Sequence, residues 1–144
     1  MKKIVFESLK SKLIAMGFLY NTPRSLLSYQ DKRDIIQFGL IHFTFSENMS
    51  NILKDGVLPG KEALYRKEKN LCWFYINYPE DYEKNLSIVK SKGKRSAVDC
   101  CIVIKDFSEE QLNNMRIRKE SYNAVVHIGA LKTSNMKGIM LENK

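Results

Sequence analysis

A histidine and a threonine stand two positions apart at the end of an apolar run. His42 and Thr44 close the stretch that starts at Ile35, and a polar segment begins at Ser46. An imidazole at a strand end is a directional hydrogen-bonding group that is neutral near pH 7, so it can bind a sugar hydroxyl. The alternative is a core histidine beside a capped helix, which needs no ligand.

The elements around this pair follow from local patterns. The β-branched and aromatic run Ile35–Phe45 predicts a buried strand, broken near Gly39. Ser46 is typical of a helix N-cap, and Asp55-Gly56 is typical of a helix end. The chain then leaves through Val57-Leu58-Pro59. A strand, a helix and a glycine turn are therefore expected in that order.

The whole segment Ile41–Pro59 resembles the opening motif of the ADP-ribosyltransferase superfamily. The closest likenesses are the DarT-type nucleic-acid-modifying toxins and the C-terminal domain of the RNA 2′-phosphotransferases. The resemblance implies an α+β fold with a split β-sheet core and short helices, and NAD as the substrate. It also implies that His42 and Thr44 contact NAD and that His42 is catalytic, while the neighbouring backbone pairs with the nicotinamide carboxamide.

An aromatic strand is expected at Leu71–Asn77, where the family presents a ring that stacks on nicotinamide. Trp73, Phe74 and Tyr75 are the candidates, and alternation puts Trp73 and Tyr75 on one face. Tyr75, near the strand end, is assigned by the resemblance to NAD binding and catalysis, in one cleft with His42. The alternative is an aromatic core strand.

The C-terminal strands predicted at 123–128 and 136–141 look like the closing hairpin of the DarT-type fold. In that family the first of these strands begins with a catalytic Glu, which holds a ribose hydroxyl and stabilises the developing positive charge. Here Asn123 takes that position and would bind NAD without the charge. Glu120, three residues earlier, is the remaining catalytic candidate.

Three functions remain open at this point. The first is an NAD-dependent ADP-ribosyltransferase that modifies nucleic acid. The second is a catalytically inactive relative that binds nucleic acid or a protein. The third is an RNA-phosphate-processing enzyme, which needs several histidines and basic residues in one cleft. His42 and His127 are the two histidines of the chain, which makes the third reading the weakest.

The charge balance favours polyanionic partners. The chain has 24 basic and 16 acidic residues, a formal charge of +8, although a solvated lysine-rich surface gives the same count. By the resemblance, Arg66 meets the NAD pyrophosphate. Candidates for nucleic-acid contacts are the basic segments Lys90–Arg95 and Arg116–Lys119 and the aromatic residues Tyr20, Tyr29, Tyr65 and Tyr122.

The 144 residues predict one α+β domain. Residues 1–34 are expected to form a helical N-terminal segment, with an amphipathic helix from Phe6 to Met16, and residues 35–144 the ADP-ribosyltransferase-like body. Further elements are expected as a helix from Pro79 to Val89, a strand from Ala97 to Ile104 and a capping box at Ser108–Gln111.

The cysteines and the apolar runs of the sequence also indicate the cellular compartment. Cys72, Cys100 and Cys101 are odd in number and lack metal-ligand spacing, which predicts reduced thiols and no structural metal. No signal-peptide pattern is visible, and the longest charge-free run, from Ile35 to Ser46, has 12 residues, too few to cross a bilayer. We therefore expect a cytoplasmic protein without a membrane partner. The pattern leaves the oligomeric state open.

Overall fold

The computed structural model describes residues 25–59, 70–91, 96–118 and 123–141. The helix predicted at Phe6–Met16 lies outside these ranges, as do Arg66, Glu120 and Lys119. Most of the basic segment Lys90–Arg95 also lies outside them, and so do three of the four tyrosines proposed for base stacking: Tyr20, Tyr65 and Tyr122.

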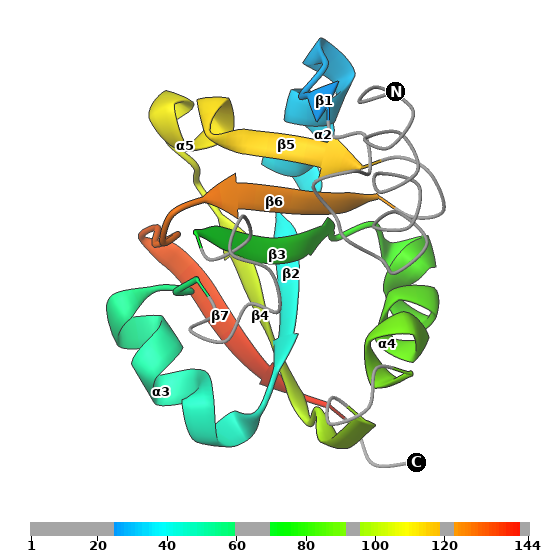
Figure 1. The fold of residues 1–144 in the computed structure, drawn as a ribbon. Coiled ribbons are helices and arrows are strands. Elements are labelled where there is room, and N and C mark those ends of the chain that lie inside the picture. The colour runs from blue at the N-terminus through cyan, green and yellow to red at the C-terminus, as the bar shows by residue number, and fades with distance from the viewer. Residues whose placement is uncertain (1–24, 60–69, 92–95, 119–122, 142–144) are drawn as a thin grey trace, which may run out of the picture.

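The described chain folds around one antiparallel sheet of seven strands (Figure 1). Their order across the sheet is β1-β5-β6-β3-β2-β4-β7, so neighbours in the sheet are mostly distant in the sequence. The strands are β1 (Ser25–Leu26), β2 (Leu40–Thr44), β3 (Leu71–Ile76), β4 (Cys100–Lys105), β5 (Met115–Arg118), β6 (Ala124–Ile128) and β7 (Asn135–Met140). The predicted α+β class is confirmed.

Short helices connect and cover the strands. Figure 1 shows α3 and α4 on opposite sides of the sheet, with α2 behind it. The helices are α2 (Tyr29–Phe38), α3 (Ser46–Asp55), the 3₁₀ helix η3 (Pro79–Asp81), α4 (Tyr82–Lys90) and α5 (Glu109–Asn113). The predicted capping box is confirmed, because Ser108 and Gln111 exchange side-chain and backbone hydrogen bonds at the start of α5.

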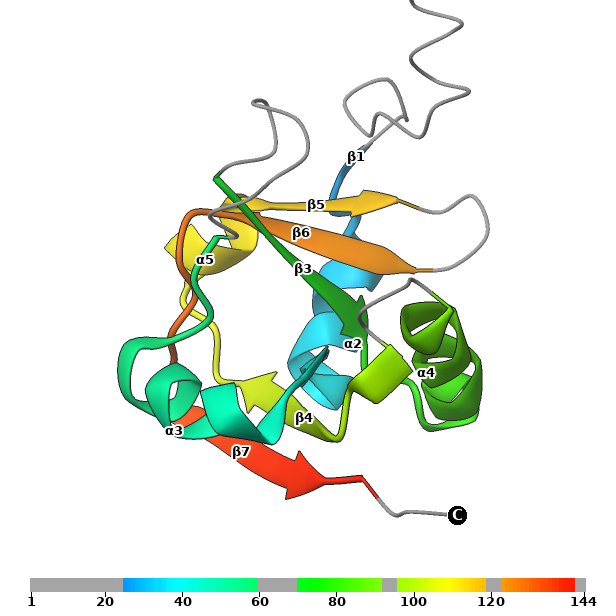
Figure 2. The same ribbon diagram turned by 60° about the horizontal axis from the view of Figure 1, so that its bottom comes forward.

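The sheet divides at its centre, between β2 and β3. These two strands share only two register pairs, Leu40↔Ile76 and Ile41↔Tyr75, and then separate. On either side the ladders are longer, since all of β2 pairs with β4 and five residues of β3 pair with β6. The two halves therefore fan apart, as Figure 2 shows.

Each face of the sheet carries its own core. Leu40, Phe74 and Ile102 belong to the larger cluster, which also contains Ile35 of α2. Ile41, Phe43 and Tyr75 belong to a second cluster, against which α4 packs through Val89, Tyr82 and Leu86. Side chains alternate strictly between these faces along β2 and β3, as expected for strands.

The strand predicted at Ile35–Phe45 is wrong in its first part. Residues 35–38 complete α2, and the strand begins only at Leu40. Ser28 and Asp31 form a capping box at the start of α2, and this cap extends the helix through residues whose propensity favours a strand. Gly39, at φ +79°, ends the helix.

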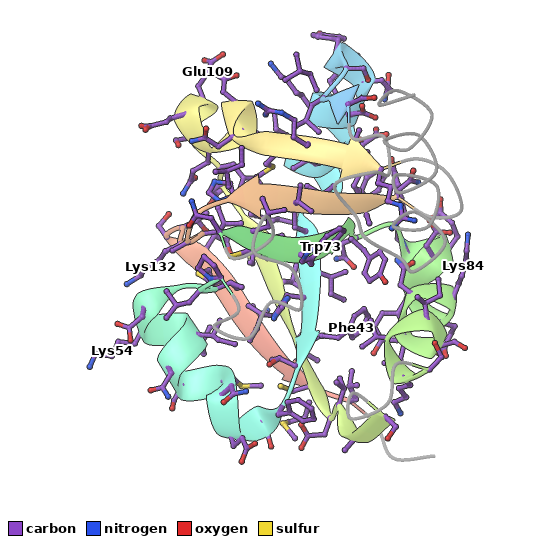
Figure 3. The ribbon with its side chains drawn as sticks, viewed as in Figure 1. Phe43, Lys54, Trp73, Lys84, Glu109 and Lys132 are labelled. Carbon is purple, nitrogen blue, oxygen red and sulfur yellow. The ribbon has the colours of Figure 1, made fainter. Side chains whose placement is uncertain are left out.

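The predicted helix after Thr44 is confirmed, but its cap differs. Ser46 is its first residue, not its N-cap, and its N–H and hydroxyl each donate to the Asp99 carboxylate at 2.7 Å. At the other end, Gly56 closes the helix as expected, and the Lys132 ammonium donates to the Lys54 carbonyl (Figure 3). Both ends of α3 are therefore held by distant residues.

The closing hairpin predicted from the C-terminal strands is wrong. Strand β6 pairs with β3 and β5, whereas β7 pairs with β4 at the opposite edge of the sheet. The strand β5, with the sequence Met115–Arg118, was not expected and takes the place beside β6. Within the described ranges, no helix is long and apolar enough to cross a membrane.

Candidate functional site

The candidate site lies where β2 leaves β3. Ladder hydrogen bonds in an antiparallel pair connect every second residue. Here the N–H of Asn77 donates to the carbonyl of Gly39 at 3.0 Å, and Ile41 faces Tyr75 as the next pair. In the same register Phe43 would face Trp73, but the pairing of β2 with β3 ends before these two residues. The strand separation therefore interrupts the ladder at this pair.

The imidazole of His42 bridges this interruption. Its Nδ1 lies 2.9 Å from the carbonyl oxygen of Trp73. Because a carbonyl only accepts, Nδ1 carries the hydrogen, and in the neutral ring Nε2 carries the lone pair. The ring is half-buried and lies 5.6 Å from the ring of Phe74. A strand-to-strand contact thus orients the histidine predicted from the His-x-Thr pattern.

The backbone of Phe43 faces the same separation. The Gly39 carbonyl accepts from Asn77 after β3, whereas the Thr44 carbonyl accepts from Asp99 before β4, so alternation turns the N–H and C=O of Phe43 toward the β3 side. Its side chain is buried in the second core, 6.4 Å from the ring of Tyr75, and Figure 3 shows it between β2 and α4. One donor and one acceptor of a single residue therefore lie beside His42.

Thr44 is buried at the end of β2, on the face that also carries His42. Its carbonyl accepts from the N–H of Asp99 at 3.3 Å and from the Cys100 thiol at 3.4 Å. The structure therefore gives its backbone a positioning role, which ties the end of β2 to β4.

The structure does not bring Tyr75 together with His42. Tyr75 is 8% exposed and packs in the second core, on the opposite face of the sheet from His42. It is held among Phe43, Ala124 and α4, where no ring face is open for stacking on a ligand. The half-buried Trp73 lies on the same face as Tyr75, but its carbonyl is the group that meets His42.

Asn123 comes directly before β6. Its carbonyl accepts from the N–H of Ile76 at 3.4 Å, which places it beside the last residue of β3, at the paired end of β2 and β3. His42 lies on the diverging part of β2. Arg66 and Glu120 are outside the described residues.

The other candidates show mainly structural contacts. His127 is 4% exposed; its Nδ1 donates to the carbonyl of Gly129 at 2.9 Å, and in the described part of the chain Nε2 has no partner. Arg116, proposed for nucleic-acid contacts, donates to the carbonyls of Asn113 and Met115. Among the described residues no cluster of His, Cys, Asp or Glu has the geometry to hold a metal ion.

Two contributors to this region were missed by sequence reasoning. The Asp99 carboxylate anchors α3 directly after β2, and the hydrogen bonds from Ser46 lower its pKa below the ordinary value of 3.8. Phe43 contributes through its backbone. Neither has a signal in the sequence, because Asp99 is 53 positions from Ser46 and backbone direction depends on pairing.

Comparison with protein-family models, with curated proteins and with solved structures gave no match to this chain.

Proposed function

We propose that this protein is an ADP-ribosyltransferase-like protein that binds NAD where β2 and β3 separate. The observation that carries the proposal is the hydrogen bond from His42 to the Trp73 carbonyl, made at the point where the central ladder stops. A split sheet is the architecture that the resemblance implies. The His-x-Thr strand, the helix α3 and the Gly56 turn follow one another as in that motif.

Two groups beside the separation suit the nicotinamide riboside end of NAD. The imidazole of His42, oriented by the Trp73 carbonyl, would hydrogen-bond a ribose hydroxyl. The N–H and C=O of Phe43 would pair with the carboxamide, which itself offers one acceptor and two donors. Because both come from consecutive residues of one strand, a single element would orient the sugar and the leaving group together.

The reaction would transfer ADP-ribose to an acceptor. The bond between nicotinamide nitrogen and the anomeric carbon breaks, its electron pair goes to nicotinamide, and a nucleophile of the acceptor bonds to the same carbon and loses its proton. A nearby carboxylate stabilises the positive charge that develops on the sugar. In this proposal Glu120 is that carboxylate, the acceptor is a nucleic acid or a protein, and the protein acts in the cytoplasm.

A second candidate is an inactive relative that serves as a nucleic-acid- or protein-binding module. The observation favouring it is Asn123, an amide directly before β6, where the family places its glutamate. An amide retains hydrogen bonding to a ribose hydroxyl but supplies no charge, so NAD would bind without being cleaved.

Nicotinamide release separates the two candidates. We expect wild type to release nicotinamide from NAD, and Glu120→Gln to lower the rate about 10²- to 10³-fold, as for loss of one stabilising group. Glu110→Gln, an exposed glutamate on α5, is the matched control and should leave the rate unchanged. Turnover that survives Glu120→Gln would contradict the assignment of Glu120. An inert wild type that gains slow hydrolysis on Asn123→Glu would establish the second candidate.

A further inference from the structure

The outer edge of β7 has backbone groups that no described strand pairs with. In the described chain β7 pairs with β4 alone, over six residues from Asn135 to Met140. Figure 2 shows this strand along the lower rim of the molecule, with no described element on its outer side. An exposed edge of this length is a template for another strand.

The direction of these backbone groups follows from the ladder. The N–H of Leu141 donates to the carbonyl of Asp99 at 2.9 Å, in register with the β4–β7 pairs. Odd-numbered residues of β7 therefore turn their peptide groups toward β4. The N–H and C=O groups of Met136, Gly138 and Met140 consequently point away from the sheet.

The side chains along this edge do little to prevent association. Ile139 is 44% exposed and Met140 57% exposed, and β7 contains no proline. Edge strands that avoid pairing are usually very short, bulged or covered, or carry charged residues or proline. Here Lys137 is the one charged residue of the strand.

We propose that β7 pairs antiparallel with β7 of a second copy, with Gly138 on the two-fold axis. Residues that lie opposite each other must have their side chains on the same face of the sheet. Each residue whose N–H and C=O point outward must also lie opposite such a residue of the second copy. The register centred on Gly138 satisfies both conditions for Met136, Gly138 and Met140. It places Met136 against Met140 of the second copy, and Lys137 against Ile139 of the second copy.

Charge distinguishes this register from the one centred on Lys137. Centring the pair on Lys137 sets two lysines directly opposite each other, which is unfavourable. Centring it on Gly138 lays the aliphatic stem of each lysine over an isoleucine. Helix α3 contacts β7 through Met49, which covers one face at Gly138 and leaves the edge open.

Light scattering tests the proposal: it measures the molar mass of the protein as it elutes from a size-exclusion column, over a range of concentrations. We expect wild type to shift from one to two copies as concentration rises. Ile139→Lys sets lysine against Lys137 at two symmetric places and should weaken the dimer about two- to thirtyfold. Adding Lys137→Glu to that variant replaces both repulsions by ion pairs and should restore the dimer.

The matched control is Ile36→Lys, at an isoleucine on α2 that is also exposed, which should leave the dimer unchanged. Circular dichroism establishes that each variant is folded. A wild type that stays monomeric throughout would overturn the proposal, and so would a dimer indifferent to Ile139→Lys. A dimer lost in Ile139→Lys and not restored by Lys137→Glu would overturn the Gly138-centred register.

Discussion

At the scale of single residues, one imidazole joins two strands that have stopped pairing. His42 donates to Trp73, 31 positions away, in place of the ladder bond that the separation removes. The His-x-Thr pattern made His42 a candidate from the sequence alone. Its partner could not be predicted, because a backbone carbonyl is present at every residue and only the strand order selects this one.

The glycine after α3 allows a residue-scale prediction. Gly56 has φ +88°, and a Cβ there would lie 2.6 Å from the carbonyl oxygen of Leu131. Gly129 has φ +86°, and apart from its chain neighbours no atom of the described residues lies within 4 Å of its Cβ position. We therefore expect Gly129→Ala to cost about 1–3 kcal/mol from backbone strain, and Gly56→Ala to cost about 1–3 kcal/mol more from the close approach.

Chemical denaturation of both variants measures the difference. Because the two glycines have nearly the same φ, Gly129→Ala serves as the control for strain. Equal losses of unfolding free energy would contradict a close approach between Gly56 and Leu131, and with it the tight attachment of the turn that follows α3.

At the scale of elements, the helix α3 depends on residues outside itself. The Asp99 carboxylate lies at its positive N-terminus and the Lys132 ammonium at its negative C-terminus, as the helix dipole favours. Within the helix no residue is buried, so these contacts and the packing of half-buried Met49 and Ile52 hold it on the sheet. The sequence showed the helix and its glycine stop but not these anchors.

The anchor at Asp99 predicts a dependence of stability on pH. Hydrogen bonds from Ser46 lower the pKa of Asp99 in the folded protein below 3.8, so the contact stabilises the fold above that pH. This stabilisation is lost as the pH falls through the folded-state pKa. We expect Asp99→Asn to lower the melting temperature at pH 7 and to make less and less difference as the pH falls through the folded-state pKa of Asp99.

Asp55→Asn, at the other end of α3, is the control. It removes a negative charge from the negative end of the helix dipole, so the melting temperature should stay the same or rise at pH 7. Melting curves between pH 2 and pH 7 test both variants. A destabilisation by Asp99→Asn that is the same at every pH would contradict a role for the charge.

Local patterns predicted some elements well and others poorly for identifiable reasons. The strand from Leu71 and the capping box at Ser108 were predicted correctly, because alternation and capping are local signals. Residues 35–38 were misassigned because a cap at Ser28 outweighs the strand propensity of two isoleucines. The four residues of strand β5 alternate apolar and basic side chains, a strand signal that was missed, and they pair with β6.

At the scale of the whole molecule, the division between β2 and β3 organises the candidate site. It follows from which strands pair, and strand order was not accessible from local patterns. For the same reason β6 and β7, neighbours in sequence, were wrongly expected to form a hairpin. The register sets Tyr75 opposite Ile41, so Tyr75 and His42 lie on opposite faces, and proximity in the sheet did not give the shared cleft that was expected.

We propose that NAD binds beside His42, and the chain offers an internal control for testing this. His42 and His127 are its two histidines, and both can be followed by nuclear magnetic resonance after selective labelling of the imidazole rings. We predict that NAD shifts the His42 ring signals in a saturable way and leaves those of buried His127 unchanged. A His42 signal that stays in place at saturating NAD, or one that moves equally with His127, would contradict NAD binding beside His42.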